Sequence, residues 1–152
     1  MRRLLGSALA LALALAGCAG EAPPPVIELG TGVTGFEPLA AGGMPPIYEG
    51  SQGGYHIYVH MRGRHLEGGA VELAVSASGG DGSLRCRGFY PEVELVDVGG
   101  GWSELAEPIR CYVPEPVGMP GQTLRLELSA VDGDGRAASD LRMIVAGEIV
   151  PR

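Results

Sequence analysis

The chain has 152 residues, of which 45% are hydrophobic, and its formal net charge at pH 7 is −7. The acidic charge argues against a nucleic-acid-binding protein, which needs a basic surface, and the hydrophobic content is too high for a disordered chain. The sequence also places 26 glycines and 12 prolines between short hydrophobic stretches. This pattern favours a turn-rich, all-β protein.

The first segment is typical of an export signal. Arg2 and Arg3 supply positive charge, and residues 4–16 form a mostly hydrophobic run. This run is shorter than the roughly 20 residues that a membrane-spanning helix needs. The segment is therefore predicted to direct export and to be removed, not to remain as a membrane span.

The motif Leu15-Ala16-Gly17-Cys18 closes this segment. These four residues resemble the lipobox of bacterial lipoproteins. The resemblance implies cleavage after Gly17, acylation of Cys18, and attachment of the protein to the lipid bilayer through its acyl chains, two of which suffice for stable anchoring. Ala19 replaces the Asp that retains many Gram-negative lipoproteins in the inner membrane, which favours the outer membrane. The alternative is an ordinary signal peptide followed by a chance cysteine.

The chain is thus expected to divide into three parts. Residues 1–17 are the signal peptide, residues 18–25 are the lipidated N-terminus and a flexible tether, and residues 26–152 form a single domain. Three consecutive prolines, residues 23–25, favour an extended conformation for the tether.

The domain is expected to contain about seven strands joined by Gly- and Pro-rich turns. Hydrophobic and polar residues alternate most clearly in residues 55–62, 71–77 and 122–131. In the last expected strand, Leu141, Met143 and Val145 share one face. The pattern resembles an antiparallel immunoglobulin-like β-sandwich, with a closed barrel as the alternative. Further strands are expected over residues 26–29, 84–90, 92–98 and 136–147, with a loop over 30–46 and a break at Pro91. Residues 102–105 and 109–113 flank Pro108 and are either one kinked strand or two short ones.

Two cysteines remain besides Cys18. Cys86 and Cys111 form an even pair in an exported protein, and exported proteins fold in an oxidising compartment. A disulfide between Cys86 and Cys111 is therefore predicted.

One polar row is a candidate binding face. His56, Tyr58, His60 and Arg62 alternate with hydrophobic residues and so share one side of the strand over residues 55–62. Aromatic and arginine side chains are favoured at interfaces, although they are also ordinary on a strand that faces solvent. The histidines themselves are expected to be exposed.

No catalytic, metal or cofactor site is predicted. His56 and His60 lie four residues apart, about 13 Å along a strand, which is too far to share one zinc ion. The Asp132-Gly-Asp-Gly segment departs from the EF-hand pattern and favours a β-turn, with a different calcium site that would use Asp132, Asp134 and Asp140 as an alternative. The segment over residues 50–54 lacks the ending of a phosphate-binding loop and favours a tight turn.

These observations predict a non-enzymatic, membrane-anchored module of the cell envelope with a binding or structural role. Its expected partners are other envelope proteins or an extracellular polymer, and its ligand is left open. The segment over residues 52–56 resembles a stretch found in small bacterial lipoproteins and implies no activity. The alternative function is an envelope hydrolase whose histidines and carboxylates are brought together by the fold.

Overall fold

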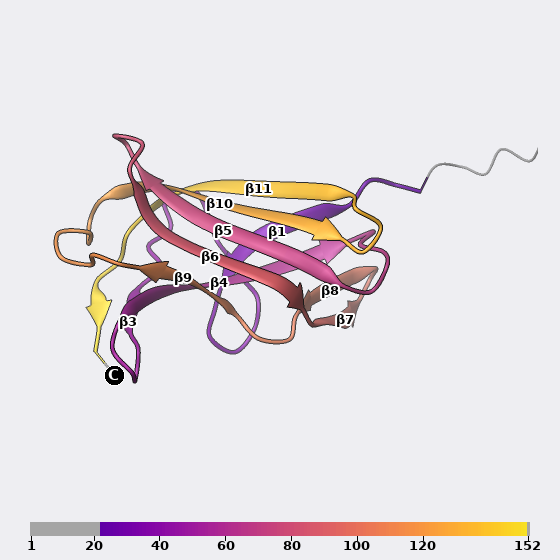
Figure 1. Ribbon diagram of the computed structural model, residues 1–152, viewed down its shortest axis with the longest axis horizontal. Coiled ribbons are helices and arrows are strands. Elements are labelled where there is room, and N and C mark those ends of the chain that lie inside the picture. The colour runs from indigo at the N-terminus through magenta and orange to yellow at the C-terminus, as the bar shows by residue number, and fades with distance from the viewer. Residues whose placement is uncertain (1–21, 152) are drawn as a thin grey trace, which may run out of the picture.

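The computed structural model describes residues 22–151, and this part of the chain contains strands and no helix (Figure 1). The prediction of an all-β, antiparallel fold is confirmed. Among residues 22–151 there is accordingly no helix long and hydrophobic enough to cross a membrane. The strands are β1 (Val26–Thr31), β2 (Glu37–Pro38), β3 (Ile47–Glu49), β4 (Tyr55–Arg64), β5 (Val71–Gly79), β6 (Leu84–Val93), β7 (Leu95–Gly99), β8 (Trp102–Leu105), β9 (Ile109–Val113), β10 (Thr123–Asp132), β11 (Ala137–Val145) and β12 (Ile149–Val150).

The strands form one curled sheet whose two ends meet. Its main path runs β11-β10-β5-β6-β9-β4-β1-β2, with β3, β12, β7 and β8 attached at the side. The sheet curls until β1 packs against β11. There, the backbone N–H of Leu29 donates a 2.8 Å hydrogen bond to the Asp140 carboxylate. The Asp140 side chain thus bridges the seam, by which we mean the line along which β1 and β11 meet. The result is a sandwich-like half-barrel.

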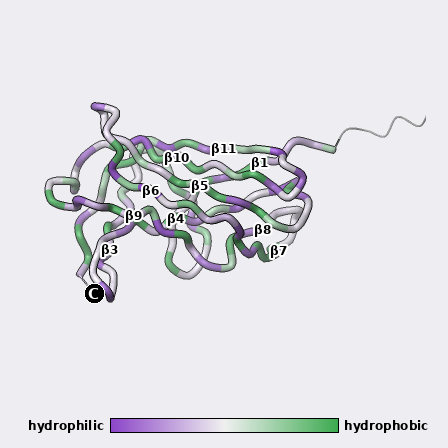
Figure 2. Tube along the Cα trace, viewed as in Figure 1, coloured by the Kyte–Doolittle hydropathy of each residue, from purple (hydrophilic) through white to green (hydrophobic). Residues whose placement is uncertain are grey.

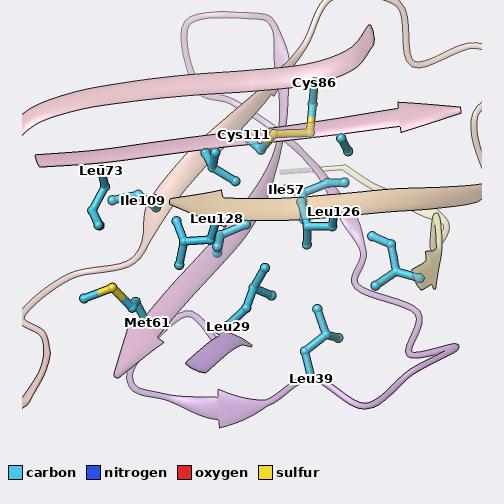
Figure 3. Packing of buried hydrophobic residues seen from close by; sticks show 14 of the residues in the cluster. Leu29, Leu39, Ile57, Met61, Leu73, Cys86, Ile109, Cys111, Leu126 and Leu128 are labelled. Atoms are coloured by element: carbon cyan, nitrogen blue, oxygen red, sulfur yellow. A yellow bond between two sulfur atoms is a disulfide. The ribbon is translucent and has the colours of Figure 1, made fainter. Parts of the chain in front are cut away.

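The core lies inside this curl. Ile57 of β4, Leu73 of β5, and Leu126 and Leu128 of β10 are all completely buried, as the alternation in these strands predicts. Figure 3 shows these side chains and Leu29 of β1 gathered between the two halves of the sheet. Along the strands, hydrophobic and hydrophilic residues are interspersed (Figure 2), as expected for a sheet with one wet side.

The orientation of β11 differs from the sequence-based expectation. Leu141 and Met143 share a face, but that face is turned to solvent, with 36% and 47% of these residues exposed. The opposite face carries buried Ile144 together with Asp140 and Arg142, which form a 2.6 Å ion pair. Because Asp140 must reach the free N–H of β1, the polar face of this strand turns toward the seam.

Other differences concern strand boundaries. Pro91 does not end β6, because the β5–β6 pairing contains a register shift between Val71 and Leu73, where an irregularity accommodates the proline. Three of the twelve strands within residues 22–151, β2, β3 and β12, were not expected, because they have only two or three residues each; the other nine correspond to the segments identified from the sequence. Strands this short carry no detectable alternation.

The predicted disulfide is confirmed. Cys86 in β6 and Cys111 in β9 are bonded, and their Cα atoms lie 5.3 Å apart (Figure 3). Backbone pairing between these two strands is limited to a single residue pair, Arg87 with Tyr112. The disulfide is therefore a principal connection between β6 and β9.

A buried carboxylate ties together the end of the domain at which the described residues begin. Asp132, at the end of β10, accepts hydrogen bonds from the backbone N–H of Glu67 and from the guanidinium of Arg136. Arg136 also donates to the carbonyl groups of His65 and Pro23. The β10–β11 hairpin, the β4–β5 connection and the first described residues thus share one hydrogen-bonded centre.

This centre predicts a specific dependence of stability on pH. Burial alone raises the pKa of Asp132, but the N–H groups of Glu67 and Arg136 and the Arg136 guanidinium outweigh it, and the net pKa is lowered from 3.8 to about 2. A lowered pKa means that ionised Asp132 stabilises the fold above its unfolded pKa, and that this contribution is lost as the pH falls toward about 2. Asp132→Asn is therefore expected to destabilise the protein at neutral pH, and the difference from wild type should narrow between about pH 4 and pH 2. Urea unfolding of both proteins across this pH range measures the difference in their free energies of unfolding. A difference that does not change with pH would contradict a lowered pKa for Asp132.

Candidate functional site

The predicted binding face lies on one side of β4, but it is not uniformly open. His56 is 6% exposed and His60 is 1% exposed, so the expectation of exposed histidines is wrong. Tyr58 and Arg62 are half-buried. Aromatic side chains from neighbouring segments cover this face and separate its four residues into two clusters.

The first cluster surrounds His60 and Arg62. The Phe36 ring meets the His60 ring edge-on at 6.1 Å. The Arg62 guanidinium lies 4.8 Å from the centre of the Phe36 ring and 4.7 Å from that of Trp102, and it forms a 2.7 Å ion pair with Glu28. Since Arg62 is already stacked and neutralised, this cluster holds β1, β4 and β8 together and leaves little for a ligand to bind.

The second cluster lines a pocket of about 540 Å³, a size that suits a small molecule. Strand pairing places its side chains. His56 of β4 lies opposite Tyr48 of β3 and Tyr112 of β9, and Tyr58 lies opposite Arg110. Residues in register on neighbouring strands share a face, so these five side chains gather on the outer face of the sheet. The turn after β3 and the end of β12 complete the wall, with Glu49, Gly50, Ser51, Gln52, Gly53, Val150 and Pro151.

Three aromatic rings form the base of this cluster. The rings of Tyr48 and Tyr58 lie 5.1 Å apart in a tilted arrangement, and the His56 ring meets that of Tyr58 edge-on at 4.6 Å. Such offset and edge-on pairs are the favoured geometries of aromatic contacts. The mutual packing fixes the orientation of the His56 ring within the pocket wall.

His56 has an unsatisfied nitrogen. Its Nε2 is buried and has no hydrogen-bond partner among the described residues. Burial lowers the pKa of His56, and the positive charge of Arg110 lowers it further, so the imidazole is neutral at neutral pH. A neutral imidazole carries one donor and one acceptor nitrogen. A buried polar atom without a protein partner calls for another partner, such as a ligand group or an ordered water.

The glycine-rich turn lies next to this imidazole. Gly53 and Gly54 adopt φ angles of 81° and 85°, which favour glycine, and the N–H of Gly50 bonds to the carbonyl of Gly54 at 2.9 Å. The segment is thus a tight turn between β3 and β4. A Cβ atom on Gly50 would lie 3.8 Å from His56 Cε1, the ring carbon between the two nitrogens. The turn therefore borders the edge of the ring that carries its nitrogens.

Arg110 is positioned by its backbone. Its N–H donates to the Tyr90 hydroxyl, which in turn donates to the Arg110 carbonyl, both at 2.8 Å. The guanidinium lies 5.9 Å from the centre of the Tyr58 ring, and contacts with the hydroxyls of Tyr58 and Tyr112 raise its pKa. Arg110 takes part in none of the ion pairs formed within residues 22–151. The pocket thus contains a guanidinium that forms no ion pair among the described residues, although the Glu49 carboxylate lines the same pocket.

Metal binding finds no support in this arrangement. Among residues 22–151, no three His, Cys, Asp or Glu side chains are placed to hold a metal ion. Asp132 bonds to Arg136 and Asp140 bonds to Leu29 and Arg142, so two of the three carboxylates of the calcium alternative serve separate structural contacts. Cys18, the predicted lipidation site, lies outside the described residues.

Sequence reasoning found two of the five central pocket residues, His56 and Tyr58. Tyr48, Arg110 and Tyr112 were missed because they come from separate short strands whose alignment is a property of the fold. Together the five residues offer aromatic surface, a neutral imidazole and an unpaired cation to one bound molecule. Protein-family models scanned against the chain give no match, and a search of curated proteins gives none.

Proposed function

We propose that this protein is a lipid-anchored, non-catalytic binding module of the bacterial cell envelope, and that its ligand occupies the pocket around His56. The observation that carries the proposal is the buried, unpartnered Nε2 of His56 in the pocket wall. Leaving a buried polar atom unsatisfied costs about 1–3 kcal/mol. A ligand that supplies the missing partner recovers this cost and gains a fixed orientation.

The position of the pocket supports a tethered binding role. Val26 at the start of β1 pairs with Arg64 at the end of β4, whereas Tyr58 lies six residues earlier, roughly 20 Å along the strand. In Figure 1, the described chain begins at one end of the long axis, and β3 and the C-terminus lie at the other. An anchor at Cys18 would therefore present the pocket away from the bilayer.

A binding role is favoured over the alternative, an envelope hydrolase. General acid–base hydrolysis needs a histidine oriented by a carboxylate or another partner. None of the hydrogen bonds within the described residues joins a histidine ring to a carboxylate, and His60 Nδ1 instead accepts the N–H of Met61 at 3.1 Å. The pocket contains Glu49 and His56, but it holds no nucleophile bonded to a base.

The pocket is tested by following the histidine ring signals in NMR spectra. The purified protein in detergent micelles is titrated with soluble fractions of a cell-envelope extract. At least one fraction is expected to shift the ring signals of His56, because Nε2 gains a partner. The exposed His65, at the opposite end of β4, is the internal control and should not move. Equal shifts at both residues, or no shift at His56 with any fraction, would contradict the proposal.

The anchor is tested separately by Cys18→Ser. The wild-type protein is expected to carry the added mass of acyl chains and to partition into membranes, and the variant is expected to lose both properties. Mass spectrometry and membrane fractionation measure this. A wild-type protein of unmodified mass that remains in the soluble fraction would contradict the anchor.

A further inference from the structure

We infer that the pocket takes an acidic saccharide, whose carboxylate binds Arg110 and whose sugar ring lies against Tyr112. The inference rests on the proposed function and names the ligand class of the same pocket. Three features of the pocket wall lead to it independently.

The first feature is the fixed cation. Arg110 has no ion-pair partner within residues 22–151, and the hydroxyl of Tyr90 holds both of its backbone polar groups. A guanidinium pairs with a carboxylate through two parallel hydrogen bonds, which are among the stronger contacts available to a partly exposed group. Glu49 also lines the pocket, and the chain as a whole is acidic. With one arginine and one glutamate in its wall, in an acidic protein, the pocket accommodates a singly charged carboxylate better than a doubly charged phosphate.

The second feature is an aromatic surface that remains accessible. Tyr112 is 53% exposed although it lines the pocket, whereas Tyr48 and Tyr58 are half-buried against each other. The face of an aromatic ring is electron-rich. The C–H groups on one face of a sugar ring are apolar and slightly positive, so they pack favourably on such a surface. Tyr112 lies two residues from Arg110 on the same face of β9, and both residues line the pocket.

The third feature is the hydrogen-bonding capacity of the wall. The free Nε2 of His56 requires a partner that suits either tautomer of the ring. A sugar hydroxyl can both donate and accept, so it satisfies the nitrogen in either state. The polar side chains of Ser51, Gln52 and Glu49 surround the same space and offer further partners for hydroxyl groups. A purely apolar ligand would leave the buried Nε2 of His56 unpaired.

The inference is tested with two disaccharides that differ only in the oxidation of one terminal carbon, cellobiouronic acid and cellobiose. Isothermal titration calorimetry with the purified protein is expected to show tighter binding of the acid. Arg110→Gln should weaken binding of the acid about tenfold and weaken binding of cellobiose much less, because cellobiose has no carboxylate to pair with the guanidinium. Arg125→Gln removes an exposed arginine on β10, outside the pocket, and should change neither affinity. Unfolding midpoints verify that both variants fold.

The possible outcomes separate this inference from the proposed function. Equal binding of both sugars, or unchanged binding by the Arg110→Gln variant, would overturn the preference for an acid and leave a saccharide pocket. If neither sugar binds while an envelope fraction still shifts the His56 signals, the saccharide class is wrong and the binding function stands. If neither the sugars nor any fraction affects His56, the inference and the proposed function both fail.

Discussion

Replacing Cys86 and Cys111 together by alanine is expected to lower the free energy of unfolding by about 3–4 kcal/mol. The disulfide closes a loop with a sequence separation of 25 residues, and the chain-entropy estimate for such a loop gives this magnitude. Urea unfolding of the double variant and of the wild type measures the difference. A loss below about 1 kcal/mol would show that the strands hold together without the bond.

The same variant should also weaken ligand binding by more than its loss of stability explains. Arg110 and Tyr112 flank Cys111 on β9, so loss of the disulfide weakens the connection of two pocket residues to β6, while the pairing of β9 with β4 remains. Leu128→Ala, a destabilising change on β10 that does not touch the pocket, is the matched control. Ligand affinity is compared under conditions in which both variants remain folded. Equal affinities would contradict a role for the disulfide in positioning the pocket.

Leu128→Ala and Leu141→Ala are expected to differ sharply, although these residues lie in adjacent strands with similar alternation. Leu128 is completely buried, so its truncation should cost about 2–5 kcal/mol. Leu141 is 36% exposed on the outer face of β11, and its truncation should cost roughly 1 kcal/mol or less. Chemical denaturation of the two variants provides the comparison. A large loss for Leu141→Ala would mean that β11 turns its leucine inward and that Asp140 does not bridge the seam to β1.

The sequence was most informative where a long strand has one buried face. The alternation in residues 124–130 and 71–77 correctly identified residues that are buried in the core. The pairing of Cys86 with Cys111 followed from the number of cysteines and the inferred compartment. Each of these features depends on local spacing or on counting, which the sequence displays directly.

The features that could not be predicted from the sequence depend on how the sheet curls. Alternation shows that His56 and His60 share a face, but it does not reveal that Tyr48 and Phe36 cover that face. Alternation also fails to give the orientation of β11. There the Asp140 carboxylate turns inward to bond to β1, so the neighbouring Leu141 turns toward solvent. Residues that meet only through strand alignment, such as Arg110 with Tyr58, leave no periodic signal in the chain.

The most direct test of a tethered binding module uses a photoreactive amino acid in living cells. It is placed at Tyr112, which is 53% exposed and lines the pocket, or at Phe89, which is 61% exposed on neighbouring β6 and does not. Irradiation is expected to attach envelope material to the membrane-bound protein from position 112 and not from position 89. If the two positions give the same products, or position 112 gives none, the protein does not hold an envelope ligand in this pocket.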